Sequence, residues 1–207
     1  LFIQNIVKIK KAAAIVNERI GRLEHEKAEA IISACEEIIN GEHSDAFIVD
    51  AIQGGAGTSA NMNANEVIAN RAIEILGGKK GDYSLVHPND HVNIAQSTND
   101  VIPTAGKMTV IDLIQPLLVS LYMLALSFDG KAKEFDSIIK MGRTQLQDAV
   151  PIRLGQEFSA YAAVVRRDIG RIEAAEREMH TVNLGGSAIG TSINVTPEYL
   201  AEIPKVL

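Results

Sequence analysis

The chain has 207 residues, of which 46% are hydrophobic and 22% charged, proportions that are ordinary for a globular protein of one or two domains. Its net charge of −6 leaves no basic excess, which argues against a nucleic-acid partner. Aromatic residues make up only 4% and tryptophan is absent, so we expect an aliphatic core. Cys35 is the only cysteine. No intramolecular disulfide can form, and we expect a buried thiol in a protein of the reducing cytoplasm.

Apolar residues at helical spacing predict an all-α fold, an elongated bundle of long helices. Helices are predicted, in chain order, over residues 8–17, 24–40, 61–76, from 97 to 128 or 135, and 154–183. The last would be roughly 45 Å long, and helices of such length are stable only when they pack against others. No stretch of alternating apolar and polar residues predicts a β-strand.

Residues 110–128 form the best candidate for a membrane span. Asp112, Gln115 and Pro116 interrupt this segment, so we interpret it as a buried helix of the bundle and expect no membrane partner. No signal peptide is visible at the start, where residues 1–7 have the helical pattern of a chain already under way. We therefore expect the chain to be part of a longer protein.

Three polar segments each precede a predicted helix, and they span residues 54–66, 87–100 and 142–151. The first contains glycines that let a ligand approach the main chain closely, and also Asn61, a candidate helix cap. Hydroxyl and amide groups at helix N-termini suit a small anionic substrate, because these ends offer unpaired N–H groups and a positive dipole. We expect the three segments to converge on one pocket.

The three segments resemble the fumarase/aspartase superfamily, and its ammonia-lyase branch most closely. Two further motifs extend the resemblance through nearly the whole chain, residues 10–14 (KKAAA) and residues 185–191 (GGSAIGT). The resemblance implies a homotetramer around a central bundle of long helices, in which each active site receives loops from three subunits. It also implies that residues 1–96 are the remainder of an N-terminal helical domain with the first substrate loops, and that residues 97–207 begin the central bundle domain.

The activity implied by the resemblance is the reversible deamination of L-aspartate, a small dicarboxylate, to fumarate and ammonia by β-elimination. Thr58, Ser97 and Thr98 would bind the side-chain carboxylate and stabilise the enediolate that develops there. Asn99 would meet the amino group and Thr144 the α-carboxylate. The resemblance implies no organic cofactor and no metal in the site, although some aspartases respond to divalent cations. From the residues alone, the run from Ser97 to Asn99 also suits a helix cap, and this alternative stays open.

Gln145, which the resemblance also places at the substrate, stands where fumarases carry histidine after a Gly-Arg-Thr motif. Glutamine orients a ligand by hydrogen bonds but does not titrate near neutrality. Loss of water from malate needs an acid, because hydroxide is a poor leaving group, whereas the amine of aspartate leaves already protonated. Gln145 therefore favours ammonia loss. We interpret the neighbouring Arg143 as an anchor of the loop to Asp148 or another carboxylate, with a substrate clamp as the alternative.

His87, Asn89 and Asp90 resemble a loop near a secondary carboxylate site of fumarases, and we carry them as a second candidate site. His87 and His91 are four residues apart, which is a helical metal-ligand spacing. Pro88 argues against one shared helical face, so we expect no metal pair.

The superfamily carries its catalytic base on a later loop with paired serines, followed by a lysine and an asparagine. No part of these 207 residues matches that loop, so we expect the base serine outside this chain. Two alternatives to aspartate deamination stay open. One is fumarase activity on malate, and the other is a non-catalytic helical scaffold derived from the same family.

Overall fold

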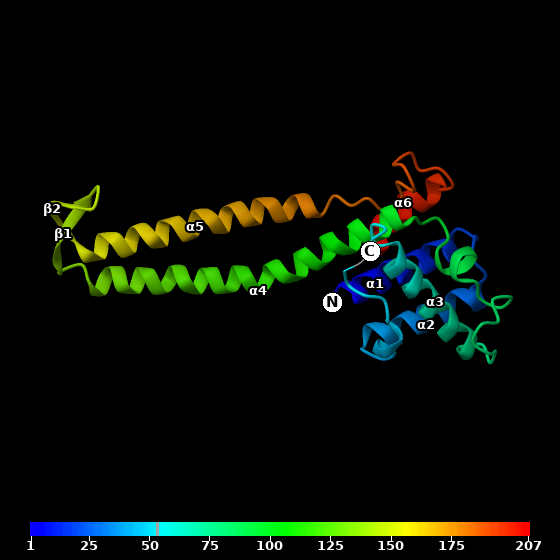
Figure 1. The fold of residues 1–207 in the computed structure, drawn as a ribbon. Helices are drawn as coiled ribbons and strands as arrows, with labels where there is room; N and C mark the ends of the chain where they lie inside the picture. The colour runs from blue at the N-terminus through cyan, green and yellow to red at the C-terminus, as the bar shows by residue number, and fades with distance from the viewer. Residues whose placement is uncertain (53) are drawn as a thin grey trace. The chain divides into compact units, whose positions relative to one another are not determined.

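The computed structural model describes residues 1–52 and 54–207. It contains two compact units, which we call unit 1 (Leu1–Thr109 and Val182–Leu207) and unit 2 (Val110–Thr181). The longest helix, α4 (Thr98–Glu134), begins in unit 1 and ends in unit 2 (Figure 1). Helices dominate both units, which confirms the predicted all-α class. The predicted boundary at residue 96 concerns domains of the whole protein and stays a prediction.

Unit 1 is a cluster of helices. It contains α1 (Phe2–Arg19), α2 (His25–Ile39), the 3-10 turn η1 (Ser44–Ala46), α3 (Thr58–Ile75), the π-helix η2 (Pro88–Val92), the start of α4, and α6 (Pro197–Val206). Glycines at positive φ follow α1 and α2, as predicted from Gly21 and Gly41. Helix α3 begins at Thr58 because Gly57, at φ 86°, is its N-cap. Asn61, predicted as a cap, therefore lies inside the helix.

Helix α6 is an element that sequence reasoning missed. Its start carries a recognisable signal, because the Thr196 side chain accepts a hydrogen bond from the backbone N–H of Tyr199 at 3.3 Å and Pro197 occupies the first helical position. A threonine–proline pair ahead of an apolar helical pattern is the signal that would have predicted this helix.

Two groups of buried apolar side chains form the core of unit 1. One joins α1, α2 and α3 with η2 and includes Cys35, which is buried as predicted. The other joins α1, α3 and the start of α4 with α6, around Ile9, Val101 and Tyr199. Aliphatic residues dominate both groups, as the low aromatic content predicts. The charged side chain of Lys10 is also fully buried in this unit.

Unit 2 pairs the second part of α4 with α5 (Leu154–Met179) as antiparallel helices (Figure 1). The ring of Phe128 on α4 lies 6.2 Å from the ring of Phe158 and 5.7 Å from that of Tyr161, both on α5. Farther along the pair, the Tyr122 hydroxyl donates to the Glu173 carboxylate at 2.8 Å. The two helices are thus held together by aromatic packing at one end and polar contacts along their length.

A β-hairpin connects α4 to α5, and the prediction that the chain contains no strand is wrong here. Strand β1 (Ile139–Thr144) pairs antiparallel with β2 (Gln147–Arg153). The connecting residues Gln145 and Leu146 both have positive φ, 50° and 62°, as a type I′ turn requires. Nearly every residue of the hairpin is solvent-exposed, so no apolar face imposes the alternation from which strands are predicted.

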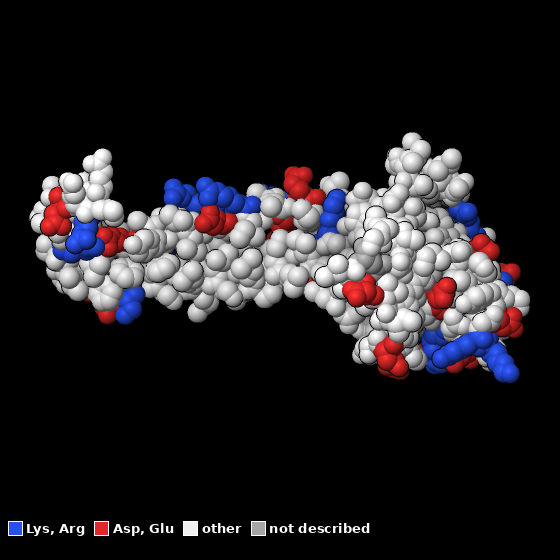
Figure 2. Space-filling view, viewed as in Figure 1, with Lys and Arg blue, Asp and Glu red and all other residues white. Residues whose placement is uncertain are grey.

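Helix α4 is the one helix, among the residues described, that is long and apolar enough to cross a membrane by length and composition. A core helix of a soluble protein meets the same criteria. Only 11% of its most apolar window is buried, so the burial predicted for residues 110–128 is not reached within this chain. The reason is geometric, because one partner helix covers one face only. In Figure 2, the surface of unit 2 along α4 is mostly uncharged, whereas charged side chains follow α5.

Candidate active site

The N-terminus of α4 is closed by a reciprocal pair of hydrogen bonds. The Ser97 hydroxyl oxygen accepts from the backbone N–H of Asn99 at 3.2 Å, and the Asp100 carboxylate accepts from the backbone N–H of Ser97 at 3.0 Å. Ser97 therefore caps α4, with its hydroxyl on the second helical N–H, and the capping interpretation of Ser97 is confirmed. A hydroxyl that accepts one hydrogen bond still has its own hydrogen to donate. Capping therefore leaves Ser97 able to bind an anion.

The N-terminus of α3 lies beside that of α4. The backbone at Gly57 approaches Ile102 so closely that an added Cβ atom would lie 2.8 Å from Cγ1 of that side chain. One turn into α3, the buried Asn61 side chain donates from Nδ2 to Oγ1 of Thr98 at 3.2 Å. The first and second polar segments thus meet, with Thr58 at the start of α3 and Thr98 at the start of α4.

Asn61 is a residue whose role sequence reasoning missed. Its Nδ2 donates to the Thr98 oxygen, so the Thr98 hydroxyl acts as an acceptor towards Asn61 and keeps its own hydrogen as a donor. The signal in the sequence is weak, since an asparagine three residues after Thr58 also suits a helix cap. Only the packing of α3 against α4 distinguishes the two roles.

Asn99 lies at the surface, and the loop that contains Ala188 holds its side chain. Its Nδ2 donates to the backbone carbonyl of Ala188 at 2.6 Å. A carbonyl only accepts, so this contact orients the amide and leaves Oδ1 on the opposite side as an acceptor. The same loop, from Gly186 to Gly190, lines a cavity of about 300 Å³ together with Asn99, Asp100 and Asn183.

Thr144 and Gln145 lie at the tip of the hairpin in unit 2, and both are exposed. Positive φ at a residue other than glycine costs conformational energy and is frequent at functional sites. Arg143 forms an ion pair with Asp148 at 3.5 Å, which confirms its interpretation as an anchor within the loop. Thr58, Ser97, Thr98 and Asn99 come together in unit 1; convergence of the hairpin tip with them stays a prediction.

The secondary candidate site lies at the start of η2. The ring nitrogen Nδ1 of His87 accepts from the backbone N–H groups of Asn89 and Asp90, at 3.2 and 3.1 Å. The Nδ1 atom of His91 accepts in turn from the backbone N–H of His87 at 2.8 Å, and burial lowers the pKa of His91. Both rings therefore act as caps, and within the described residues they do not form a group suited to a metal ion.

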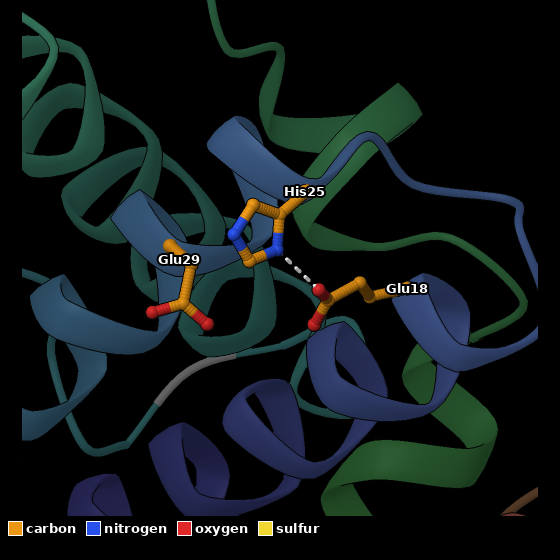
Figure 3. A group of neighbouring side chains, drawn as sticks. All are labelled: Glu18, His25 and Glu29. Atoms are coloured by element: carbon orange, nitrogen blue, oxygen red, sulfur yellow. Dashed lines mark hydrogen bonds and ion pairs between the residues drawn. The ribbon is translucent and has the colours of Figure 1, made fainter.

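Two other groups among the described residues bring potential metal ligands within 4.8 Å of one another. Figure 3 shows one of them, Glu18, His25 and Glu29. Here Nδ1 of His25 lies 2.5 Å from Oε1 of Glu18, and this hydrogen bond raises the pKa of a largely exposed imidazole. That ring nitrogen is thus engaged by a carboxylate. The group is better described as a surface contact between His25 and Glu18.

The second such group contains Glu37, Glu42 and His43. Arg71 binds the Glu37 carboxylate through two nitrogens, at 2.5 and 2.9 Å, and this hydrogen bonding lowers the pKa of Glu37 to about 2. The Glu37 carboxylate is thus already neutralised by a guanidinium group, as in a structural ion pair.

Comparison with known proteins adds to this geometry. A family model described as a lyase matches residues 3–207. The chain belongs to this lyase family, the fumarase/aspartase superfamily. It is 55% identical to an aspartate ammonia-lyase of Bacillus subtilis (strain 168) over 199 residues, which are 96% of this chain and 42% of the relative. A class II fumarate hydratase of Halobacterium salinarum is 51% identical over 199 residues, 96% of this chain and 42% of the relative.

Two solved structures of lyases are similar throughout the chain. A fumarate lyase:delta crystallin from Brucella melitensis bound to cobalt has a TM-score of 0.93 and 50% identity, covering 98% of this chain and 44% of that one. A class II fumarase from Schistosoma mansoni has a TM-score of 0.92 and 36% identity, covering 98% of this chain and 42% of that one. The chain thus spans less than half the length of these relatives.

Proposed function

We propose that the protein is an aspartate ammonia-lyase, which converts L-aspartate reversibly to fumarate and ammonia. The observation that carries this proposal is the meeting of the α3 and α4 N-termini in unit 1. There Thr58, Ser97 and Thr98 offer hydroxyl donors at the positive dipole ends of two helices, an arrangement that suits a carboxylate on which negative charge develops.

The reaction is a β-elimination. A base, the serine that we expect on a loop outside this chain, removes a proton from Cβ of aspartate. The electron pair of that C–H bond moves into the adjacent carboxylate and forms an enediolate with two negative charges. Thr58, Ser97 and Thr98 stabilise this species by hydrogen bonds, which commonly contribute several kcal/mol when the donors are preorganised. The enediolate then collapses to fumarate, the C–N bond breaks and its electron pair leaves with ammonia.

The other groups of the substrate are assigned to two further side chains. The Asn99 amide, oriented by its bond to Ala188, turns its oxygen away from that loop and suits the ammonium group of aspartate. Thr144, at the hairpin tip, binds the α-carboxylate and Gln145 orients the substrate by hydrogen bonds. His87, Asn89 and Asp90 form a secondary carboxylate site.

Fumarase activity is the second candidate, and a halobacterial fumarate hydratase stands among the relatives. Gln145 favours aspartate, because it supplies no proton to a departing hydroxide while the amine of aspartate needs none. We further propose that the whole enzyme is a cytoplasmic homotetramer with active sites shared between subunits. The apolar surface of α4 would then pack against other subunits rather than lipid. No organic cofactor takes part in this scheme, and divalent cations would act as activators only.

The test is an assay of the full-length protein with L-aspartate and with L-malate, in which fumarate is followed by its ultraviolet absorbance. We expect fumarate from aspartate and little from malate. Fumarate from malate alone would identify a fumarase. Absence of product from both substrates, in a folded tetramer, would contradict both activities and favour the scaffold.

A further inference from the structure

A buried polar cluster lies beneath the N-terminus of α4. Lys10, in the middle of α1, is 0% exposed, and its Nζ donates to Oδ1 of Asn93 at 2.7 Å. Nδ2 of Asn93 donates to the backbone carbonyl of Gln96 at 3.2 Å, and the Asp100 carboxylate accepts from the backbone N–H of Ser97 at 3.0 Å. The peptide group between Gln96 and Ser97 is therefore held at both of its polar atoms.

The turn that carries this peptide is strained. Ala95 has φ 58°, a conformation that residues with a side chain adopt only at a cost in energy. Such a residue persists where its surroundings hold it in place. Asn93 does so twice, since its backbone carbonyl accepts from the N–H of Gln96 at 3.1 Å and its side chain binds the Gln96 carbonyl. Lys10 in turn orients the Asn93 side chain.

Packing alone does not account for a lysine at this position. Burial lowers the pKa of Lys10 to about 7, and among the described residues Cys35 of α2 and Asp100 of α4 are the ionisable groups that act on it. Burial also raises the pKa of Asp100 and that of the Cys35 thiol. A buried ammonium group is costly, and an apolar side chain of similar length would fill the same space without that cost.

We propose that Lys10 is a positioning residue for the active site. Through its hydrogen bond to Asn93, it holds the peptide between Gln96 and Ser97 and so places the hydroxyls of Ser97 and Thr98. The inference rests on the proposed function, since those hydroxyls are the groups assigned to the substrate. Lys10 is fully buried, so it has no direct access to the substrate.

The test compares two lysine variants of the full-length enzyme. Lys10→Met keeps the length of the side chain and removes its donor, whereas Lys11→Met removes the adjacent, partly exposed lysine, which pairs with Glu36 at 2.8 Å. For Lys10→Met we expect kcat to fall about 10- to 100-fold, the scale of a misplaced catalytic contact, with a small change in KM and no loss in Tm. Lys11→Met should keep the wild-type kcat. A wild-type kcat for folded Lys10→Met would overturn the inference, as would a loss explained entirely by a lower Tm.

Asn93→Leu provides an independent variant in case Lys10→Met does not fold. If Lys10 acts through Asn93, Asn93→Leu should lower kcat similarly, and the double variant should be little worse than either single one. Fully additive losses, or a wild-type kcat for soluble Asn93→Leu, would contradict the proposed route.

Hydrogen exchange gives a readout that does not depend on activity. We expect faster amide exchange in a peptide covering residues 93–100 for Lys10→Met and not for Lys11→Met. The wild-type assay separates this inference from the proposed function. A wild-type enzyme that turns over malate and not aspartate would refute aspartate deamination, and the Lys10 comparison would then be made with malate. Unchanged exchange in Lys10→Met would overturn the inference whichever substrate is used.

Discussion

The oxygen of the Thr98 hydroxyl accepts a hydrogen bond from Asn61, which leaves the hydroxyl its own hydrogen to donate. Thr98→Val keeps the shape and removes the hydroxyl. We expect kcat for aspartate to fall by about 10²- to 10³-fold with little change in KM, since the contact strengthens as charge develops. Steady-state kinetics would check this. Ser120→Ala is a matched control, because that hydroxyl donates within its own helix to the Pro116 carbonyl at 2.9 Å. A change in KM alone would reduce Thr98 to a ground-state contact.

Gln145 permits a test of the leaving-group argument. Histidine tolerates the left-handed conformation found there, φ 50°, better than most residues. Gln145→His would also add a group that titrates near neutrality, at a pKa of about 6.5. We expect malate dehydration to appear or rise severalfold, with a pH dependence near neutrality that the wild type lacks. Fumarate release from malate across pH 5.5–8.5 would measure it. Unchanged malate activity in a folded variant would undercut the argument.

At the scale of elements, the hairpin depends on the absence of a side chain at Gly142. A Cβ atom there would lie 2.8 Å from the Val150 backbone carbonyl, so the strands would have to separate. We expect Gly142→Ala to lower Tm and to raise KM for aspartate severalfold by displacing Thr144. Gly130→Ala is the matched control, because nothing lies within 4 Å of its added Cβ on helix α4. That change should be neutral or stabilise by about 0.5–1 kcal/mol. Equal behaviour of the two variants would show that the hairpin tolerates the side chain.

Lys10, a buried residue of α1, makes the free energy of unfolding depend on pH. Its pKa falls from 10.5 to about 7 on folding, because burial disfavours the ammonium form. Between these values the unfolded chain holds a proton that the folded chain has released, so stability rises with pH across the window. Relative to Lys10→Met, the wild type should gain up to about 4 kcal/mol between pH 7 and 10. Tm measured for both proteins at several pH values would test the sign. A constant difference in Tm would mean that Lys10 keeps its ordinary pKa.

At the scale of the whole molecule, shared active sites predict complementation between inactive subunits. Thr98→Val and Thr144→Val each remove a contact assigned to the substrate, from different polar segments. If these segments reach one site from different subunits, random reassembly of an equal mixture should restore about one site in four. Activity measured before and after joint denaturation and refolding would detect it. Refolding each variant separately is the control, and no recovery in mixed tetramers would contradict shared sites.

The apolar surface of α4 bears on the assembly of the whole molecule. Large hydrophobic residues remain exposed along it, among them Leu113, Leu117, Val119 and Met123. The hydropathy of this helix predicts that its apolar surface is buried against a partner, but it does not identify that partner. The proposed tetramer supplies the cover from copies of the same chain.

Local periodicity and capping chemistry along the chain were enough to predict helices α1 to α5, the glycines that end α1 and α2, and the polar segments before α3 and α4. Sequence periodicity could not reveal the hairpin, since exposed strands carry no apolar alternation. Which polar groups meet depends on the packing of the folded chain. Asn61 reaches Thr98 across 37 residues, Lys10 reaches Asn93 across 83, and Asn99 reaches Ala188 across 89. Such contacts follow from how helices pack in three dimensions, and no spacing along the chain encodes them.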